Sequence, residues 1–251
     1  MDGIKFLLKG RTAFFKKPDV NTYLYFTYGN IHKIALLGII GAAMGFKGYT
    51  FQDEKTYPEF YEKLKDLKFS VVPDNNPGGF IPKKIQTFNN SVGYASQESG
   101  GNLVVTEQWL ENPSWEIYIL IDDNPYIDEI KDRLLNGKFV YLPYLGKNDH
   151  FADILDTKLV KLEEVSDFDR LDSLFLKDYF EILDKADAFT GIFNEDYKEE
   201  KLWKYEEKLP EKLDENTNQY ITKRYVFTNM NVKPKKKCPV FSDGNKNLFF
   251  S

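Results

Sequence analysis

Hydrophobic and polar positions alternate in short runs along the first half of the chain and predict a succession of strands and helices. The first predicted elements are a strand over residues 4–15, a turn over 16–19, a short aromatic strand or extended loop over 23–28, a helix over 31–44, a helix over 59–67 and a strand over 68–72. The pattern resumes later with strands over 103–110 and 115–121, a helix that opens at Pro125 or Tyr126 and runs to 135, and a strand over 139–142. Gly45 and Gly48 are expected to end the first long helix, and Asn136-Gly137 to cap the later one.

Residues 73–102 differ from the rest, because apolar alternation is thin and turn residues are frequent. The segment contains Pro77-Gly78-Gly79, Lys83-Lys84, Asn89-Asn90 and Gly100-Gly101. A segment of this length without clear periodicity is usually functional or disordered. It therefore predicts either a protruding hairpin with two ribbon-like arms and a flexible tip, or a mobile loop.

The order strand, helix, strand, strand, helix, strand is that of a ferredoxin-like α+β sheet, which is also the order of the RNA-recognition fold. We assign residues 1–155 to this domain, with the arm at about 73–102. Residues 156–251 are predicted to form a smaller region, in which an acidic stretch over 160–215 carries two weak helical patterns. A late strand is expected over 220–229.

Composition indicates a folded protein, because the 251 residues are 42% hydrophobic and 16% aromatic. A single cysteine, Cys238, excludes an internal disulfide and fits a reducing compartment. The first residues lack the basic segment and cleavage site of a secretory signal. The one long apolar run, residues 34–46, is shorter than the ~20 residues that cross a bilayer. We therefore expect a cytoplasmic protein that does not enter a membrane.

The net charge of −5 hides an uneven distribution. Residues 1–90 hold 13 basic and 8 acidic side chains, and residues 216–251 hold 7 basic and 1 acidic. Residues 121–215 hold 26 acidic and 14 basic side chains. Phosphate contacts depend on local lysines and arginines, so a basic front and a basic tail are compatible with RNA. The same charges also suit an ordinary solvated surface.

The helix over 31–44 is the most informative element. Gly38, Gly41 and Gly45 recur at helical spacing, and because glycine in a helix costs ~1 kcal/mol relative to alanine, close packing is the natural reason for them. The spacing does not match a phosphate-binding P-loop. The start of the helix is different, because free backbone N–H groups beside Asn30, His32 and Lys33 favour a phosphate.

The turn over residues 141–150 combines aromatic and polar side chains after a predicted strand. Tyr144, Lys147, Asn148 and His150 are the types that stack on bases and contact phosphates in single-stranded RNA. An ordinary turn with a core tyrosine is the alternative. Two histidines and no paired cysteine give little support to a metal site, and no cofactor is expected. A metal-independent ribonuclease built on a tyrosine, a lysine and a histidine stays open.

Several motifs together resemble the Cas-five family of CRISPR-associated proteins, within the RAMP superfamily. They are Gly-Arg-x-Ala-Phe-Phe at 10–15, Tyr-Gly-Asn at 28–30, the glycine-rich helix at 35–45, the Gln-Trp-Leu-Glu-Asn-Pro segment at 108–113 with the aromatic strand after it, and Tyr-Leu-Gly-Lys-Asn at 144–148. The last motif is most similar to the subtype I-B branch. The resemblance covers roughly residues 1–155 with the motifs in order.

The resemblance implies a ferredoxin-like core with a β-hairpin thumb, for which the 73–102 arm is the candidate. It further implies a non-catalytic subunit of a type I effector complex (Cascade) that binds the 5′ handle of the CRISPR RNA and supports antiviral defence. The implied partners are the backbone (Cas-seven) and large (Cas-eight) subunits, and target DNA through the complex. In a related subtype the family member cuts precursor RNA, so a metal-independent endoribonuclease is the alternative. A generic protein-interaction domain is a third reading.

These considerations assign roles to three groups of residues. Handle phosphates are expected at Arg11, Lys16, Lys17, Asn30, His32 and Lys33. Handle bases are expected at Tyr144, Gly146, Lys147, Asn148 and His150. The contact of the thumb with the guide strand is expected at Lys83, Lys84 and Gln86.

Overall fold

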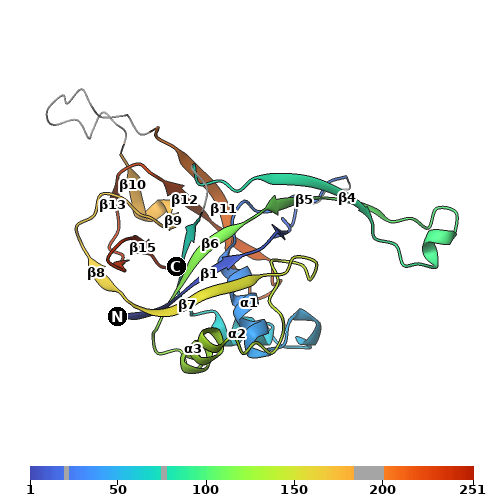
Figure 1. Cartoon of the computed structure of the whole chain (residues 1–251), viewed down its shortest axis with the longest axis horizontal. Helices are drawn as coiled ribbons and strands as arrows, with labels where there is room; N and C mark the ends of the chain where they lie inside the picture. The colour runs from blue at the N-terminus through green and yellow to red at the C-terminus, as the bar shows by residue number, and fades with distance from the viewer. Residues whose placement is uncertain (20–22, 75–77, 184–200) are drawn as a thin grey trace.

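The computed structural model describes residues 1–19, 23–74, 78–183 and 201–251. At its centre is a four-stranded antiparallel sheet in the order β3-β6-β1-β7 (Figure 1). Its strands are β1 (Asp2–Lys9), β3 (Phe69–Pro73), β6 (Ser114–Leu120) and β7 (Asp153–Lys161).

Two helices connect these strands in the ferredoxin-like manner. Helix α1 (Lys33–Met44) follows β1, and helix α3 (Ile127–Asn136) follows β6. Because β1 and β3 are both antiparallel to β6, they run parallel to each other with β6 between them. This is the split βαβ unit of the ferredoxin-like fold, so the predicted α+β class is confirmed. A short helix α2 (Glu59–Leu64) and a 3-10 turn η1 (Tyr49–Phe51) lie between α1 and β3.

The ends of the helices follow their sequence signals. The ring nitrogen Nδ1 of His32 accepts a hydrogen bond from the amide of Ala35 and caps the start of α1. Gly45 ends α1 in the left-handed conformation with φ of 80°, and Gly137 ends α3 with φ of 62°. Both glycine stops were predicted, because a residue without Cβ adopts these angles at least cost.

The two faces of the central sheet pack against different layers. Ile4, Phe6 and Leu8 of β1 are buried in the main core together with the apolar side of α1. Tyr118 and Leu120 of β6 point to the opposite face and join a second cluster with apolar residues of the last two strands. Both faces are therefore covered, which explains why β6 is apolar at most of its positions.

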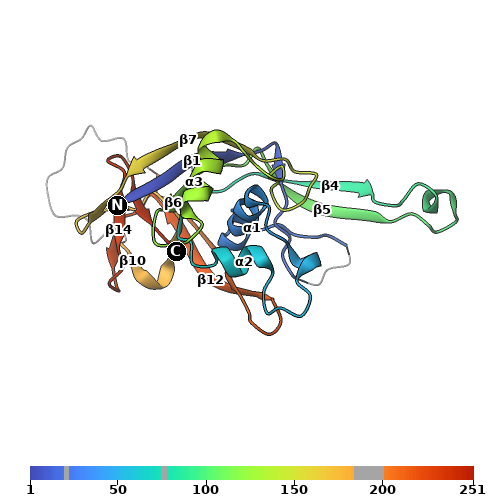
Figure 2. The same ribbon diagram turned by 90° about the horizontal axis from the view of Figure 1, so that it is seen from below.

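A long hairpin projects from the body of the molecule (Figures 1 and 2). It consists of β4 (Lys83–Asn89) and β5 (Val104–Glu111), and its tip contains a 3-10 turn η2 (Ala95–Gln97). The base of β5 pairs with the short strand β2 (Thr12–Ala13). The arm therefore extends beyond the predicted residues 73–102, because its second strand is β5, which matches the strand predicted separately over 103–110.

Two predicted strands of the core are also corrected. The strand over 4–15 is divided into β1 and β2, with a break at Gly10 and Arg11. Residues 139–142 are not a strand, and β7 provides the fourth strand of the sheet instead. The reason is that the amides of Val140 and Tyr141 donate to the carbonyl groups of Ala43 and Ala42 at the end of α1.

The described residues after 162 form small sheets. Their elements are β8 (Glu163–Val165), β9 (Phe175–Leu176), η3 (Lys177–Tyr179), β10 (Phe180–Ile182), β11 (Lys204–Leu213), β12 (Tyr220–Thr228), β13 (Val232–Pro234), β14 (Val240–Ser242) and β15 (Asn247–Phe249). They pair as β11-β12-β9, β10-β13 and β15-β14-β8. The helical patterns expected within 160–215 are not α-helices in the part of this stretch that is described, whereas the late strand is confirmed as β12.

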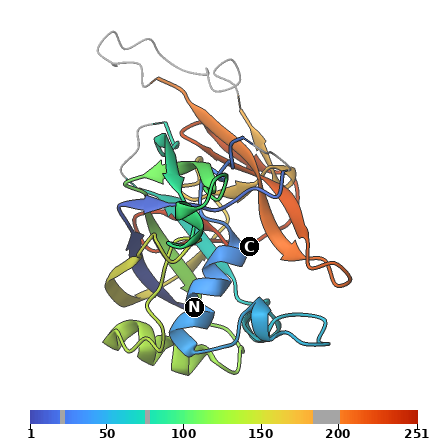
Figure 3. The same ribbon diagram turned by 90° about the vertical axis from the view of Figure 1, so that its right-hand side faces the viewer.

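The C-terminal strands and the ferredoxin-like sheet share one core. Leu209 of β11 and Phe175 of β9 belong to the same buried cluster as Leu37 of α1, and the β11–β12 hairpin runs beside α1 (Figure 3). The proposed boundary at residue 155 falls inside β7. No helix among the described residues is long and apolar enough to span a bilayer.

Candidate nucleic-acid interface

The base of the projecting hairpin is assembled from three segments that are distant in sequence. The turn over residues 144–151 closes with a bridge between Tyr144 and Phe151. The amide of Phe14 donates to the carbonyl of Leu145 at 3.0 Å, which joins this turn to β2. Gly146 has φ of 94°, and a Cβ atom there would lie 1.9 Å from the carbonyl oxygen of Phe14. Only glycine allows this approach, so the predicted role of Gly146 becomes structural.

We call the resulting surface the hairpin base and define it by the residues of these three segments. They are residues 10–17, 84–88 with 105–111, and 144–151.

Glu107 is the buried acid of the hairpin base. It is 5% exposed, and its carboxylate accepts a hydrogen bond from the indole Nε1 of Trp109 at 2.8 Å. Lys147 donates to the same carboxylate at 3.0 and 3.2 Å and lies 5.3 Å above the ring of Phe88. These contacts fix the direction of Lys147 while its side chain stays 32% exposed. Lys147 therefore presents its ammonium group at the surface in a fixed orientation.

His150 lies beneath this surface. It is 2% exposed, its Nδ1 is hydrogen-bonded to Thr12 Oγ1 at 2.7 Å, and its ring meets the ring of Trp109 edge-on with centroids 4.7 Å apart. Burial, followed by the charge of Lys147, lowers the pKa of His150. This corrects the expectation that His150 holds RNA bases, because the enclosed ring supports Trp109 from below.

The basic residues of the front loop divide into two groups. Arg11 and Lys16 are exposed, and neither forms an ion pair with any residue that the structure describes. The ammonium of Lys16 lies 3.8 Å from the centre of the Tyr25 ring. Lys17 is instead ion-paired with Glu207 of β11 at 2.6 Å. Its expected contact with a phosphate therefore competes with an existing partner.

The start of α1 is covered by the β11–β12 hairpin. Asn30 is fully buried, and its Oδ1 accepts a hydrogen bond from the indole of Trp115 at 2.9 Å. His32 is 5% exposed between the rings of Phe15, Tyr28 and Tyr220, and burial lowers its pKa to about 3. Neither side chain is available to a phosphate at the surface, which corrects both expectations.

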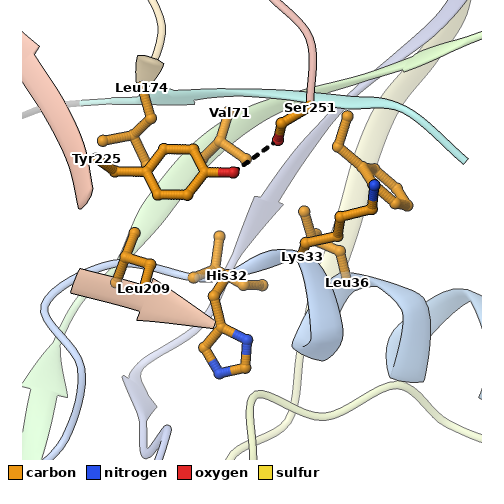
Figure 4. A pocket seen from close by; sticks show the side chains of 10 residues that line it. His32, Lys33, Leu36, Val71, Leu174, Leu209, Tyr225 and Ser251 are labelled. Carbon is orange, nitrogen blue, oxygen red and sulfur yellow. Dashed lines mark hydrogen bonds between the residues drawn. The ribbon is translucent and has the colours of Figure 1, made fainter. Parts of the chain in front are cut away.

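Lys33 lies at the edge of a small cavity between α1, β3 and β12 (Figure 4). The cavity is about 20 Å³, close to the volume of one water molecule, and Tyr225 donates a hydrogen bond to Ser251 Oγ across its wall. Burial lowers the pKa of Lys33, and the nearby Glu211 opposes this effect. Lys33 is thus a half-buried lysine of the core margin and lies outside the hairpin base.

The hairpin presents two different faces. Lys83 points to one side, where its ammonium lies 3.5 Å from the carbonyl of Thr27. Lys84 and Gln86 point to the other side, opposite Trp109 and Glu107. The three predicted thumb residues therefore do not act together, because neighbouring residues of a strand face opposite ways.

Sequence reasoning predicted Tyr144 but missed three other aromatic residues of this interface, Phe88, Trp109 and Phe151. Phe88 and Trp109 lie on the same face as Lys84, with ring centroids 6.0 Å apart, and Phe151 is 66% exposed beside Tyr144. The signal was present, because alternate positions 84, 86 and 88 of one strand share a face. Recognising it required the register of β4 against β5.

The arrangement combines exposed cations with partly exposed rings. Such surfaces bind single-stranded nucleic acids by phosphate contacts and base stacking. The at least partly exposed residues of the hairpin base include Arg11, Lys16, Lys84, Gln86, Phe88, Trp109, Tyr144, Lys147, Asn148 and Phe151, together with the acids Glu111 and Asp149.

Comparison with solved structures agrees with this fold. One chain of a "CRISPR RNA-guided surveillance complex" matches with a TM-score of 0.50 and 16% identity, over 93% of this chain and 91% of its own length. A CRISPR protein from Archaeoglobus fulgidus matches with a TM-score of 0.50 and 12% identity, over 99% and 98% of the two chains. The chain shares the fold of these two proteins. No family model and no curated protein sequence matches it.

Proposed function

We propose that the chain is a non-catalytic subunit of a CRISPR RNA-guided effector complex, and that the hairpin base holds the 5′ handle of the CRISPR RNA. The observation that carries this proposal is the hairpin base itself. It combines the exposed Arg11, Lys84 at 6.0 Å from the centre of the Trp109 ring, and Lys147 in the turn that begins at Tyr144. These residues lie at the root of an arm that projects from a ferredoxin-like sheet. The shared fold with a chain of an RNA-guided complex supports it.

The residues have distinct roles in this proposal. Arg11 and Lys84 contact phosphates, while Tyr144 and Phe151 offer exposed faces on which bases stack. The carboxylate of Glu107 keeps the ammonium of Lys147 directed at the bound RNA strand. Asn148 is exposed at the turn and supplies a donor and an acceptor for base edges.

The backbone and large subunits are proposed as protein partners, with target DNA reached through the complex. The face of the hairpin that carries Lys83 supports a protein contact. Ile85 and Val104 are 64% and 63% exposed there, and the tip adds Tyr94 at 77%. Exposed apolar side chains grouped in this way commonly mark interaction sites.

The endoribonuclease alternative has less support. A general acid or base must reach the proton that it transfers, and His150 is 2% exposed and held by Thr12. Incubation of the purified protein with labelled repeat RNA in EDTA tests this alternative directly. A single product that depends on His150 would overturn the non-catalytic assignment.

The proposal is tested by RNA binding in the assembled complex. Tyr144→Ala removes one stacking surface and is expected to weaken handle binding by ~1–3 kcal/mol, or roughly 5- to 150-fold. Arg11→Ala is expected to lower the salt slope of binding by ~0.7 for one contact with a single strand. Lys68→Ala is the matched control, because Lys68 is exposed on a separate part of the surface.

Unchanged affinity and unchanged salt slope in both hairpin-base variants would refute the proposal. Circular dichroism and thermal melting of each variant exclude unfolding as the cause of a loss.

A further inference from the structure

Four lysines lie close together in sequence, on and directly after strand β13. They are Lys233, Lys235, Lys236 and Lys237. All four are exposed, and none forms an ion pair with another residue in the described part of the chain. The one acid directly opposite them in the β10–β13 ladder is Glu181, which pairs in register with Lys233. Within the described residues, the four ammonium groups are therefore exposed and not ion-paired.

The lysines of β13 are continuous with a second group of cations. The amide of Lys235 donates to the carbonyl of Tyr179 at 2.8 Å, and the ammonium of Lys236 lies 5.3 Å from the centre of the Tyr179 ring. Tyr179 ends the turn η3, which begins with Lys177. Asp178 lies between these two, and Asp169 also lies beside β13, because its carbonyl accepts a hydrogen bond from the amide of Val232 at 2.8 Å.

Lys177 leads to a carboxylate that is surrounded by cations. Glu206 receives Lys177 at 2.9 Å, Lys204 at 3.2 Å and Arg224 at 3.4 Å. Three positive groups around one carboxylate leave a local surplus of positive charge. We call the combined surface the C-terminal basic surface. Its cations are Lys177, Lys204, Arg224, Lys233, Lys235, Lys236 and Lys237.

The composition of this surface indicates its ligand class. Among the described residues, no large apolar side chain is exposed between 160 and 220 or after Ile221. The cores of protein interfaces are enriched in aromatic residues and depleted in lysine, so a protein partner is disfavoured. A lysine is a point charge that suits phosphate, and without exposed rings the surface offers no platform for unpaired bases.

The lysines of β13 lie away from the projecting hairpin. Strands β10 and β13 are at one end of the molecule, and the β4–β5 hairpin extends from the other (Figure 1). Only the Glu206 side of the surface approaches the hairpin base, where the neighbouring Glu207 is ion-paired with Lys17. We infer that the C-terminal basic surface binds the phosphate backbone of a nucleic-acid duplex, independently of base sequence. This site is separate from the proposed handle site and does not depend on it.

The test uses the full chain and a fluorescent 20-base-pair DNA duplex, with binding measured by anisotropy at several salt concentrations. The triple variant Lys235→Ser, Lys236→Ser, Lys237→Ser is expected to bind the duplex at least ~10-fold more weakly at low salt. The slope of log affinity against log salt should fall in magnitude by ~2–3, because each lost phosphate contact contributes ~0.9.

The matched control is the triple variant Lys55→Ser, Lys68→Ser, Lys158→Ser, which changes the net charge equally at exposed lysines elsewhere. It should bind the duplex like the wild type. Equal losses in both triple variants, or no loss in the first, would overturn the inference. The inference would also be overturned if the Lys235→Ser, Lys236→Ser, Lys237→Ser variant bound single-stranded RNA more weakly but bound the duplex like the wild type. Tyr144→Ala should leave duplex binding unchanged, which separates this site from the hairpin base.

Discussion

Two glycines in helix α1 have different surroundings, and substitution to alanine should affect stability in opposite directions. A Cβ atom at Gly41 would lie 2.5 Å from Cβ of Phe60 and 3.6 Å from its Cα. The clash is with atoms fixed to the backbone of α2, so a rotamer change does not relieve it. At Gly38 no atom lies within 4 Å of the added carbon.

The magnitudes follow from these distances. Alanine in a helix is favoured over glycine by ~1 kcal/mol, so Gly38→Ala should stabilise the protein by ~0.5–1 kcal/mol. Overpacking a core costs ~1–3 kcal/mol, which exceeds the same gain at Gly41. Gly41→Ala should therefore destabilise the protein by ~1–2 kcal/mol.

Urea unfolding monitored by circular dichroism measures both changes against the wild type. Ala35→Gly in the same helix calibrates the helix propensity and should cost ~1 kcal/mol. A Gly41→Ala protein as stable as the Gly38→Ala protein would refute the packing explanation. It would show that α2 moves away from α1 at little cost.

Three other predictions concern the site and its surroundings. The pKa of His32 is about 3 in the folded protein and ~6.5 when unfolded, so the unfolded state binds more protons below pH 6.5 and stability falls as pH falls. The free energy of unfolding should fall by ~1.4 kcal/mol per pH unit, which amounts to ~2 kcal/mol at pH 5. The fall should be smaller in His32→Asn, because asparagine keeps the helix cap but does not titrate. Equal pH dependence of the two proteins in urea titrations would contradict this. Glu107→Gln and Lys147→Met should show a coupling of ~1–2 kcal/mol in a double-mutant cycle, because one partner is buried and the other one-third exposed; additive effects would contradict the ion pair. Gly146→Ala should lower the melting temperature by several degrees, since its Cβ has no room beside Phe14, and an unchanged melting curve would argue against the tight turn.

Much of the core was predictable because its signals are local. Helix α1 lies where its apolar pattern predicts and ends where Gly45 indicates, and β12 was recognised from its composition. The strand order of the ferredoxin-like sheet followed from the succession of these elements. The fourth strand was misplaced because the apolar residues at 139–142 serve the end of α1 instead.

The candidate site was less predictable because its geometry depends on distant contacts. Asn30 and His32 are at a helix start that favours phosphate, but strands more than 170 residues later cover it, and Glu207 binds the amide of Gly29 at 2.7 Å. Local sequence contains no sign of this cover. The division of Lys83 from Lys84 was foreseeable from strand alternation alone.

Photo-crosslinking tests the central claim most directly. CRISPR repeat RNA with 4-thiouridine in the handle is assembled with the complex, irradiated, and the crosslinked peptides of this chain are identified by mass spectrometry. The account predicts crosslinks in peptides that contain Trp109 and Tyr144, at the hairpin base. Crosslinks confined to the lysines at 233–237, or absent from this chain, would contradict it.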